Sequence, residues 1–153
     1  MTLVEKLTAG IEPTKDEIKD LIATFETEML TQEQIEIPVV HHFSKGVYAR
    51  QITIPKHSLV VGKIHKFENL NILSQGDITV LSVDGMFRVK APYTVVSSPG
   101  VKRLAFTHEE TVWTTIHGTD EKDVDKIEEE FIAKSYDEVV YCLDAKPLLD
   151  EGI

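Results

Sequence analysis

The chain has 153 residues, a formal net charge of −10 at pH 7 and an isoelectric point of about 5.0. This length favours one domain, and a hydrophobic content of 42% is sufficient for a core. An acidic surface repels nucleic acid and anionic lipid, and no apolar run approaches the roughly 18 residues of a membrane span, so we expect neither partner. The single cysteine, Cys142, excludes an internal disulfide, and the first residues lack the pattern of a secretory signal. We therefore expect a cytoplasmic protein.

The first 35 residues predict an arm followed by an amphipathic helix. Residues 1–12 are weakly patterned. Thr14 and Glu17 match a capping box, and apolar residues recur after them at helical spacing. These features predict a helix near 15–30, with an acidic outer face.

Two adjacent histidines, His41 and His42, lie in a segment at 38–46 that the sequence predicts to be rich in turns. Adjacent residues of an extended chain point in opposite directions, so this pair is not expected to chelate one ion. We expect one of the two on the surface and the other packed.

From Val47 to His117 every predicted element is a strand. Short runs rich in Val, Ile, Thr, Tyr and Phe alternate with turn signals, of which Asp84-Gly85 is the strongest hairpin signal. About eight short strands at this spacing are typical of a sandwich or a double-sheet barrel, so we expect at least seven strands in two packed antiparallel sheets. The predicted strands are 47–54, 59–67, 70–73, 77–83, 86–90, 93–97, 102–107 and 111–117.

A second helix is predicted near 121–134, and its acidic run Glu128-Glu129-Glu130 is interpreted as a solvated face. Residues 139–143 predict a last strand, and 144–153 form a tail. The predicted fold class is therefore mainly β, with a helix near each end. The expected divisions are an arm and helix at 1–35, a barrel at 36–118, and a helix and tail at 119–153, in one domain overall.

The stretch from Gly62 to Gly76 places charged and imidazole side chains in an otherwise apolar, β-rich region. Side-chain alternation along a strand puts Lys63 and His65 on the same face as Val61. Polar groups inside a small barrel must be hydrogen-bonded, paired or solvated in a cavity. We therefore expect the functional site here.

Alternation on two later strands adds further candidates. Arg103 shares a face with Ala105, and Trp113 shares a face with Thr115 and His117. If these faces line the barrel together with the first group, the lumen is cationic in an otherwise acidic protein.

A desolvated, unpaired positive group is costly, so something should neutralise this lumen. Three alternatives remain open. An internal carboxylate from Glu68, Glu109 or Glu110 could pair with the cations, as in a structural ion-pair network. An anionic ligand could do so instead. Alternatively, His65 and His117, with Glu68 or a water, could hold zinc or iron, although the neighbouring cations would repel the ion.

The strand block resembles the cupin, or RmlC-like, jelly roll over roughly residues 36–118. The first cupin motif has a histidine-x-histidine pair followed by a glutamate and then a glycine. Here it reads Lys63-Ile64-His65, then Asn69, then Gly76.

The second cupin motif pairs a Pro-Gly turn with a histidine, and here the turn is Ser98-Pro99-Gly100 and Arg103 occupies the histidine position. The resemblance implies a jelly-roll fold, but His65 alone is kept among the usual metal-binding positions. No metal or other cofactor is therefore expected. The chain also looks like small cupin-type proteins of tailed bacteriophages, which would place it in the host cytoplasm.

Two functional hypotheses from different classes follow. The first is a metal-independent barrel that binds a small anionic molecule, sugar-phosphate-like or nucleotide-like. Lys63 and Arg103 would hold the anion, and His65 and His117 would be acid–base groups if the ligand is turned over. The further ligand-binding candidates are Asn69, Glu68 and Trp113.

The second hypothesis is a non-catalytic structural or interaction protein, such as a phage particle or accessory protein, that uses the barrel as an oligomerisation scaffold. An open lumen would favour ligand binding, and a filled lumen would favour the scaffold. A homo-oligomer is expected in both cases, because exposed sheet edges must be covered.

Overall fold

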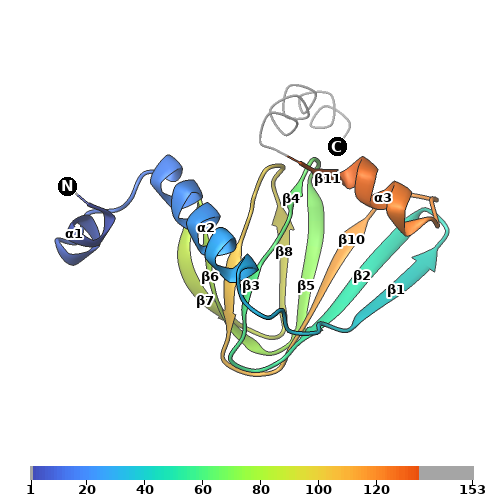
Figure 1. Cartoon of the computed structure of the whole chain (residues 1–153). Helices are drawn as coiled ribbons and strands as arrows, with labels where there is room; N and C mark the ends of the chain where they lie inside the picture. The colour runs from blue at the N-terminus through green and yellow to red at the C-terminus, as the bar shows by residue number, and fades with distance from the viewer. Residues whose placement is uncertain (1, 135–153) are drawn as a thin grey trace.

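The structure, a computed structural model, describes residues 2–134. Two antiparallel sheets face each other, and helices lie outside them (Figure 1). The helices are α1 (Leu3–Thr8), α2 (Lys15–Leu30) and α3 (Val124–Phe131). The strands are β1 (Val39–Ser44), β2 (Val47–Ile54), β3 (Leu59–Val61), β4 (Ile64–His65), β5 (Asn69–Gln75), β6 (Asp77–Ser82), β7 (Gly85–Lys90), β8 (Tyr93–Ser97), β9 (Leu104–Thr107), β10 (Thr111–His117) and β11 (Ile132–Ala133).

The two main sheets are wound from one long antiparallel hairpin. β6 pairs with β7, β5 with β8, β3 with β9 and β2 with β10, so the paired strands are nested around the β6–β7 turn. Rolling up this hairpin gives the strand orders β1-β2-β10-β5-β8 and β3-β9-β6-β7. This is a jelly roll. The predicted fold class, a mainly β double-sheet jelly roll with a helix near each end, is confirmed.

The core between the sheets lies at one end of the lumen. Leu73 from the five-stranded sheet packs against Ile78 and Val80 from the four-stranded sheet, and all three are buried. Ala105 and Trp113 pack against this cluster. A second buried cluster of Tyr48, Ile127 and Phe131 lies at the other end, and the candidate site is bordered by both clusters.

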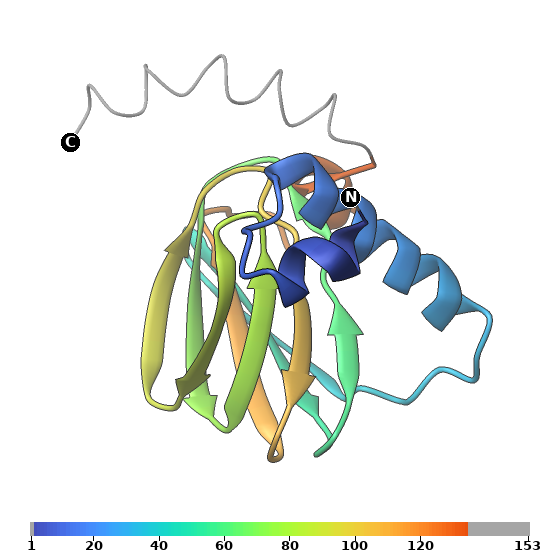
Figure 2. The ribbon, with the colours of Figure 1, turned by 90° about the vertical axis from the view of Figure 1, so that its left-hand side faces the viewer.

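Helix α2 covers the outer face of the four-stranded sheet (Figures 1 and 2). Its predicted capping box is present: the Thr14 hydroxyl accepts from the Glu17 amide, and the Glu17 carboxylate accepts from the Thr14 amide, both at 3.2 Å. Ile18 and Ile22 pack against Leu104 of β9. In the described part of the chain, no helix combines the length and apolar character needed to cross a membrane.

The N-terminal arm contains a helix that the sequence did not predict. Helix α1 is six residues long, which is too short for a periodic apolar pattern to be read from the sequence. Lys6 Nζ donates to Glu17 Oε1 at 2.6 Å and ties α1 to the start of α2.

The prediction of turns at 38–46 was wrong for most of that segment. Val39–Ser44 form β1, because Val39, Val40 and Phe43 favour a strand and β2 supplies the cross-strand hydrogen bonds. Both histidines of β1 are exposed, and they bond on different sides: His41 Nδ1 lies 2.7 Å from Tyr48 Oη, and His42 Nε2 lies 3.0 Å from Gln51 Oε1.

The single strand predicted at 59–67 is broken in two. β3 ends at Val61 and β4 begins at Ile64, with Gly62 between them. Because of the break, the adjacent residues Val60 and Val61 both line the lumen. Val61 also packs against the buried cluster that α2 forms with Leu104.

Helix α3 is shorter than the predicted 121–134, because Asp123 caps it and β11 begins at Ile132. The predicted strand at 139–143, the tail at 144–153 and Cys142 lie outside the described residues.

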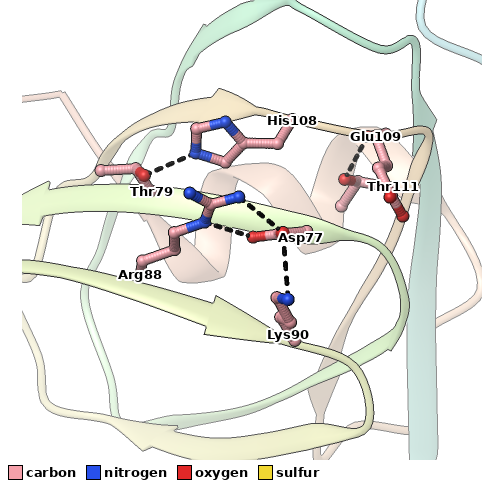
Figure 3. Close-up of polar contacts among 7 residues, drawn as sticks. All are labelled: Asp77, Thr79, Arg88, Lys90, His108, Glu109 and Thr111. Atoms are coloured by element: carbon pink, nitrogen blue, oxygen red, sulfur yellow. Dashed lines mark hydrogen bonds and ion pairs between the residues drawn. The ribbon is translucent and has the colours of Figure 1, made fainter.

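The outer face of the four-stranded sheet carries a set of mutually satisfied polar contacts (Figure 3). Asp77 is buried and accepts from Arg88 Nε and Nη2, both at 2.8 Å, with Lys90 Nζ at 3.9 Å. The hydrogen bonds from Arg88 lower the pKa of Asp77. Thr79 Oγ1 and His108 Nε2 are 2.7 Å apart. These groups satisfy one another and tie β6 to its neighbouring strands, so we assign them a structural role.

Candidate functional site

The barrel encloses two adjoining cavities. The small chamber, about 110 Å³, lies between the two sheets, and the large chamber, about 430 Å³, lies between β1, β2, β10 and α3. They meet at five residues that line both: Ile52, Val60, Lys63, His65 and Thr115. The lumen is therefore open at the point where the sequence placed the site.

Strands β2 and β10 build one continuous wall of both chambers. In their antiparallel register, the lumen-facing residues of β2 lie opposite the lumen-facing residues of β10. The pairs are Thr111–Ile54, Trp113–Ile52, Thr115–Arg50 and His117–Tyr48.

Asn71 is the centre of a buried hydrogen-bond network in the small chamber. Its Nδ2 donates to Ser97 Oγ and to Asn69 Oδ1, both at 2.7 Å. Its Oδ1 accepts from Thr115 Oγ1 at 2.8 Å and from Trp113 Nε1 at 3.1 Å. Because these groups satisfy one another, the network holds the wall of the chamber rigid.

Arg103 is attached to the edge of this network. Its Nη2 donates to Ser97 Oγ at 2.7 Å, and its Cζ lies 5.9 Å from the centre of the Trp113 ring. Burial lowers the pKa of the guanidinium. Within residues 2–134 no carboxylate lies at ion-pair distance from it. Arg103 is therefore a partly buried cation with no carboxylate at ion-pair distance in the described chain, and Asp84 attracts it only from farther away.

Lys63 does have a carboxylate partner, but not one that the sequence suggested. Its Nζ donates to Glu128 Oε1 from α3, with the two side chains 62% and 48% exposed. The alternative in which Glu68, Glu109 or Glu110 neutralises the lumen is not realised by any ion pair of the described residues. The Glu128 run was interpreted as solvated because sequence spacing does not reveal that α3 lies over the barrel mouth.

Aromatic and imidazole rings line the deep side of the large chamber. The rings of His65 and His117 stack with centroids 5.3 Å apart, and His117 also stacks on Phe131 at 4.5 Å and on Tyr48 at 6.2 Å. Among the described residues, His65 Nδ1 is the buried side-chain nitrogen or oxygen that has no hydrogen-bond partner. Such an atom is costly unless a bound molecule satisfies it.

Both imidazoles are neutral at pH 7. Burial lowers the pKa of His65 to about 4, with further lowering from His117, Arg103, Arg50 and Lys63. Burial alone lowers the pKa of His117 to about 4. Each ring therefore resists protonation until a negative charge enters the lumen.

The depressed histidine pKa values predict a loss of stability in mild acid. An unfolded histidine titrates near pH 6.5, so between about pH 6.5 and 4 the unfolded chain binds protons that the folded protein does not bind. The free energy of unfolding should therefore fall as the pH drops through this range, by on the order of 2 kcal/mol for the pair after allowing for partial solvation of the rings.

Urea titrations at pH 7.0, 5.5 and 4.5 measure this effect, with the double variant His65→Asn/His117→Asn compared with wild type. The double variant should lose less stability on acidification than wild type. His57→Asn is the matched control, because His57 is exposed and its φ of 60° suits asparagine. Equal pH slopes in wild type and the double variant would contradict the prediction.

The lumen brings together most of the candidates from the sequence. Lys63 and His65 line both chambers, His117 lines the large chamber, and Asn69, Arg103 and Trp113 line the small one. Glu68 does not join them: it is exposed and lines neither chamber.

Sequence reasoning missed several residues that line the site. Alternation within β2 could have found Tyr48 and Arg50, because both share a face with Ile52. Asn71 could have been found from Asn69 by the same rule. Nothing in the sequence points to Glu128, because its contact with Lys63 joins elements 65 residues apart.

The described side chains do not fit the metal ion that the resemblance to cupins implies. Within residues 2–134 no three His, Cys, Asp or Glu side chains converge. The nearest pair, His65 and His117, lie face to face and have Arg103 and Lys63 close to them. Two neutral imidazoles beside uncompensated positive charge are a poor donor set for a divalent cation.

Comparison with known proteins gives structural similarity only. No model of a known protein family matches the chain, and no curated protein matches it. A cupin domain from Bordetella pertussis Tohama I is similar at a TM-score of 0.45 and 10% identity, over 57% of this chain and 98% of that one. An RmlC-like cupin family protein with a double-stranded β-helix fold, from Methanocaldococcus jannaschii, gives 0.46 and 15%, over 61% and 90%. KdgF from a Halomonas species gives 0.47 and 12%, over 61% and 88%.

Proposed function

We propose that this jelly roll binds a small anionic molecule in its lumen without a metal, with Arg103 as the charged anchor. The observation that carries the proposal is the partly buried guanidinium of Arg103, which has no carboxylate partner among residues 2–134. A buried cation of this kind is costly, and an anion that bonds to its free N–H groups offsets the cost. The unpartnered Nδ1 of His65 is a second position where a ligand would supply a missing bond.

The surrounding network supports binding. Ser97 and Trp113 hold the guanidinium on one side, so its remaining N–H groups are oriented before a ligand arrives. Asn71 fixes both of these residues in turn. A prepared site loses less conformational entropy on binding than a flexible one.

Acid–base turnover would use His65 and His117. With an empty lumen both rings are neutral, and a pKa near 4 makes them weak bases at pH 7. A bound anion favours the protonated ring and raises its pKa towards the range where proton transfer is efficient. Any turnover should therefore be lost in His65→Asn while ligand binding persists.

A thermal-shift screen at pH 5.5 and pH 7.0 tests the proposal. The panel contains sugar phosphates, nucleotides, cyclic nucleotides and small carboxylates. At least one anion should give a saturable shift, equivalent to about 2.7 kcal/mol at one hundred times its dissociation constant. Binding should be tighter at pH 5.5, because the anion and the histidine protons bind cooperatively. If no anion stabilises the protein at either pH, the proposal is wrong.

The non-catalytic scaffold is the second candidate, and one observation favours it. All six residues of the edge strand β1 are exposed, and they include the apolar Val39, Val40 and Phe43. β1 pairs with β2 on one side only in the described chain, so a second copy of the protein could pair with its free edge. A monomer by light scattering at all concentrations would remove this support.

A further inference from the structure

The two chambers differ in chemistry, and this difference bears on which anion would bind. The small chamber is polar on one side and contains Arg103 and the Asn71 network. In the large chamber, nine of the seventeen lining residues are Ile, Val or Phe. We infer that the ligand is an amphipathic monocarboxylate, with its carboxylate at Arg103 and an apolar body in the large chamber. This inference rests on the proposed function.

Charge balance favours a head group with one negative charge. Two cations line the small chamber, and one of them, Lys63, already pairs with Glu128. Arg103 is therefore the one cation lining that chamber with no described carboxylate at ion-pair distance, and Arg50 of the large chamber is exposed to solvent. A carboxylate neutralises one charge and matches the planar guanidinium fork, whereas a phosphate monoester brings a second charge that would remain uncompensated.

The size of the small chamber agrees with this. The small chamber, about 110 Å³, is roughly a quarter of the size of the large one, about 430 Å³, so it suits the smaller part of a ligand. The rest of the ligand must therefore pass the junction at His65 and Thr115 and enter the large chamber. A volume of about 430 Å³ lies within the usual range for small-molecule sites.

The walls of the large chamber favour hydrocarbon over a sugar. Ile52 of β2 and the α3 residues Val124, Ile127 and Phe131 offer no polar side-chain group. The Tyr48 hydroxyl there is already bonded to His41 Nδ1 and the Lys63 ammonium to Glu128, while Arg50 is exposed to solvent at the edge of the chamber. Sugar hydroxyls buried against these walls would lose bonds to water without replacement, whereas methylene groups gain free energy on burial.

Isothermal titration calorimetry with acetate, butyrate and hexanoate tests the inference. Each methylene buried in the large chamber should tighten binding about fourfold. Phenylacetate should bind more tightly than phenyl phosphate and than glucose 6-phosphate. 1-Hexanol, which lacks the charge, should bind at least about tenfold more weakly than hexanoate.

Two variants locate the apolar body. Val124→Ser makes the wall polar at the first turn of α3, so it should reduce the gain per methylene and leave acetate binding unchanged. Val96→Ser is the matched control: Val96 is 58% exposed and lines neither chamber. It should leave the whole series unchanged.

The outcomes distinguish the amphipathic monocarboxylate from the broader proposal that the lumen binds an anion. If glucose 6-phosphate or phenyl phosphate binds more tightly than every carboxylate, or if acetate binds as tightly as hexanoate, the lumen binds anions but the amphipathic monocarboxylate is wrong. If none of these compounds binds, the amphipathic monocarboxylate is wrong, and the anion-binding proposal fails as well if no anion of the thermal-shift panel stabilises the protein. Both the monocarboxylate and anion binding are supported if affinity rises with each methylene, if Val124→Ser reduces this rise, and if Val96→Ser leaves it unchanged.

Discussion

Arg103→Met should raise the free energy of unfolding of the ligand-free protein by about 1 kcal/mol while it weakens stabilisation by anions. Burial lowers the pKa of Arg103, so its positive charge destabilises the folded state. Replacing a poorly compensated buried charge with an apolar side chain of similar length is often neutral or stabilising. Ser97, which loses one donor, keeps its hydrogen bond from Asn71. Binding should weaken by about ten- to one-hundred-fold, because a hydrogen bond to a charged group is worth about 1.5–3 kcal/mol.

Urea unfolding, with and without saturating hexanoate, measures both parts of this result. Arg103→Lys should give an intermediate loss of affinity, because it keeps the charge but removes the planar fork. Lys56→Met is the charge-matched control, since Lys56 is exposed in the β2–β3 turn. If Arg103→Met destabilises the ligand-free protein and leaves anion binding intact, Arg103 has a structural role. The non-catalytic scaffold is then the better supported function.

Gly76→Ala should destabilise the protein by on the order of 4 kcal/mol, the largest effect of a single methyl group that we expect in this chain. Gly76 has φ of +118°, a backbone conformation that costs an alanine about 1–3 kcal/mol. A Cβ there would lie 2.4 Å from Thr111 Oγ1 and 2.9 Å from Thr111 Cα. Thr111 is fully buried and cannot move away, so overpacking adds about 1–3 kcal/mol.

The chain offers a matched control for this effect. Gly85 has the same φ of +118°, but a Cβ there would meet nothing within 4 Å. Gly85→Ala therefore reports the backbone strain alone, and we expect it to cost about 2 kcal/mol. Chemical denaturation of both variants gives the comparison. Equal destabilisation by the two variants would mean that Thr111 moves to accommodate the new methyl group. The close approach of Gly76 to Thr111 would then not require glycine.

The fold could be predicted from the sequence because its signals are local. The capping box of Thr14 and Glu17 places the start of α2 within the chain itself. The alternation of Trp113, Thr115 and His117 along one strand needs no partner to be read, and all three line the lumen. Gly76 follows the cupin pattern, and the structure supplies the physical reason: its φ and its approach to Thr111.

The parts of the site that could not be predicted depend on contacts distant in sequence. The pairing of Lys63 with Glu128 requires knowing that α3 lies over the barrel mouth. Val61 lines the lumen as strand alternation predicts, but the break at Gly62 places its neighbour Val60 there as well, which alternation does not predict. For β1 the local sequence agrees with the structure: the flanking Pro38 and Gly46 signal turns, but Val39, Val40 and Phe43 between them favour a strand.

A crystal structure of the protein soaked with hexanoate would show whether Arg103 holds the head group of a ligand. We expect the carboxylate in the small chamber, with its oxygens about 2.7–2.9 Å from the free guanidinium nitrogens of Arg103. The hydrocarbon chain should pass His65 and Thr115 into the large chamber. A lumen without the acid at saturating concentration, or hexanoate bound only outside the barrel while Arg103 pairs with a carboxylate of the chain itself, would contradict this expectation.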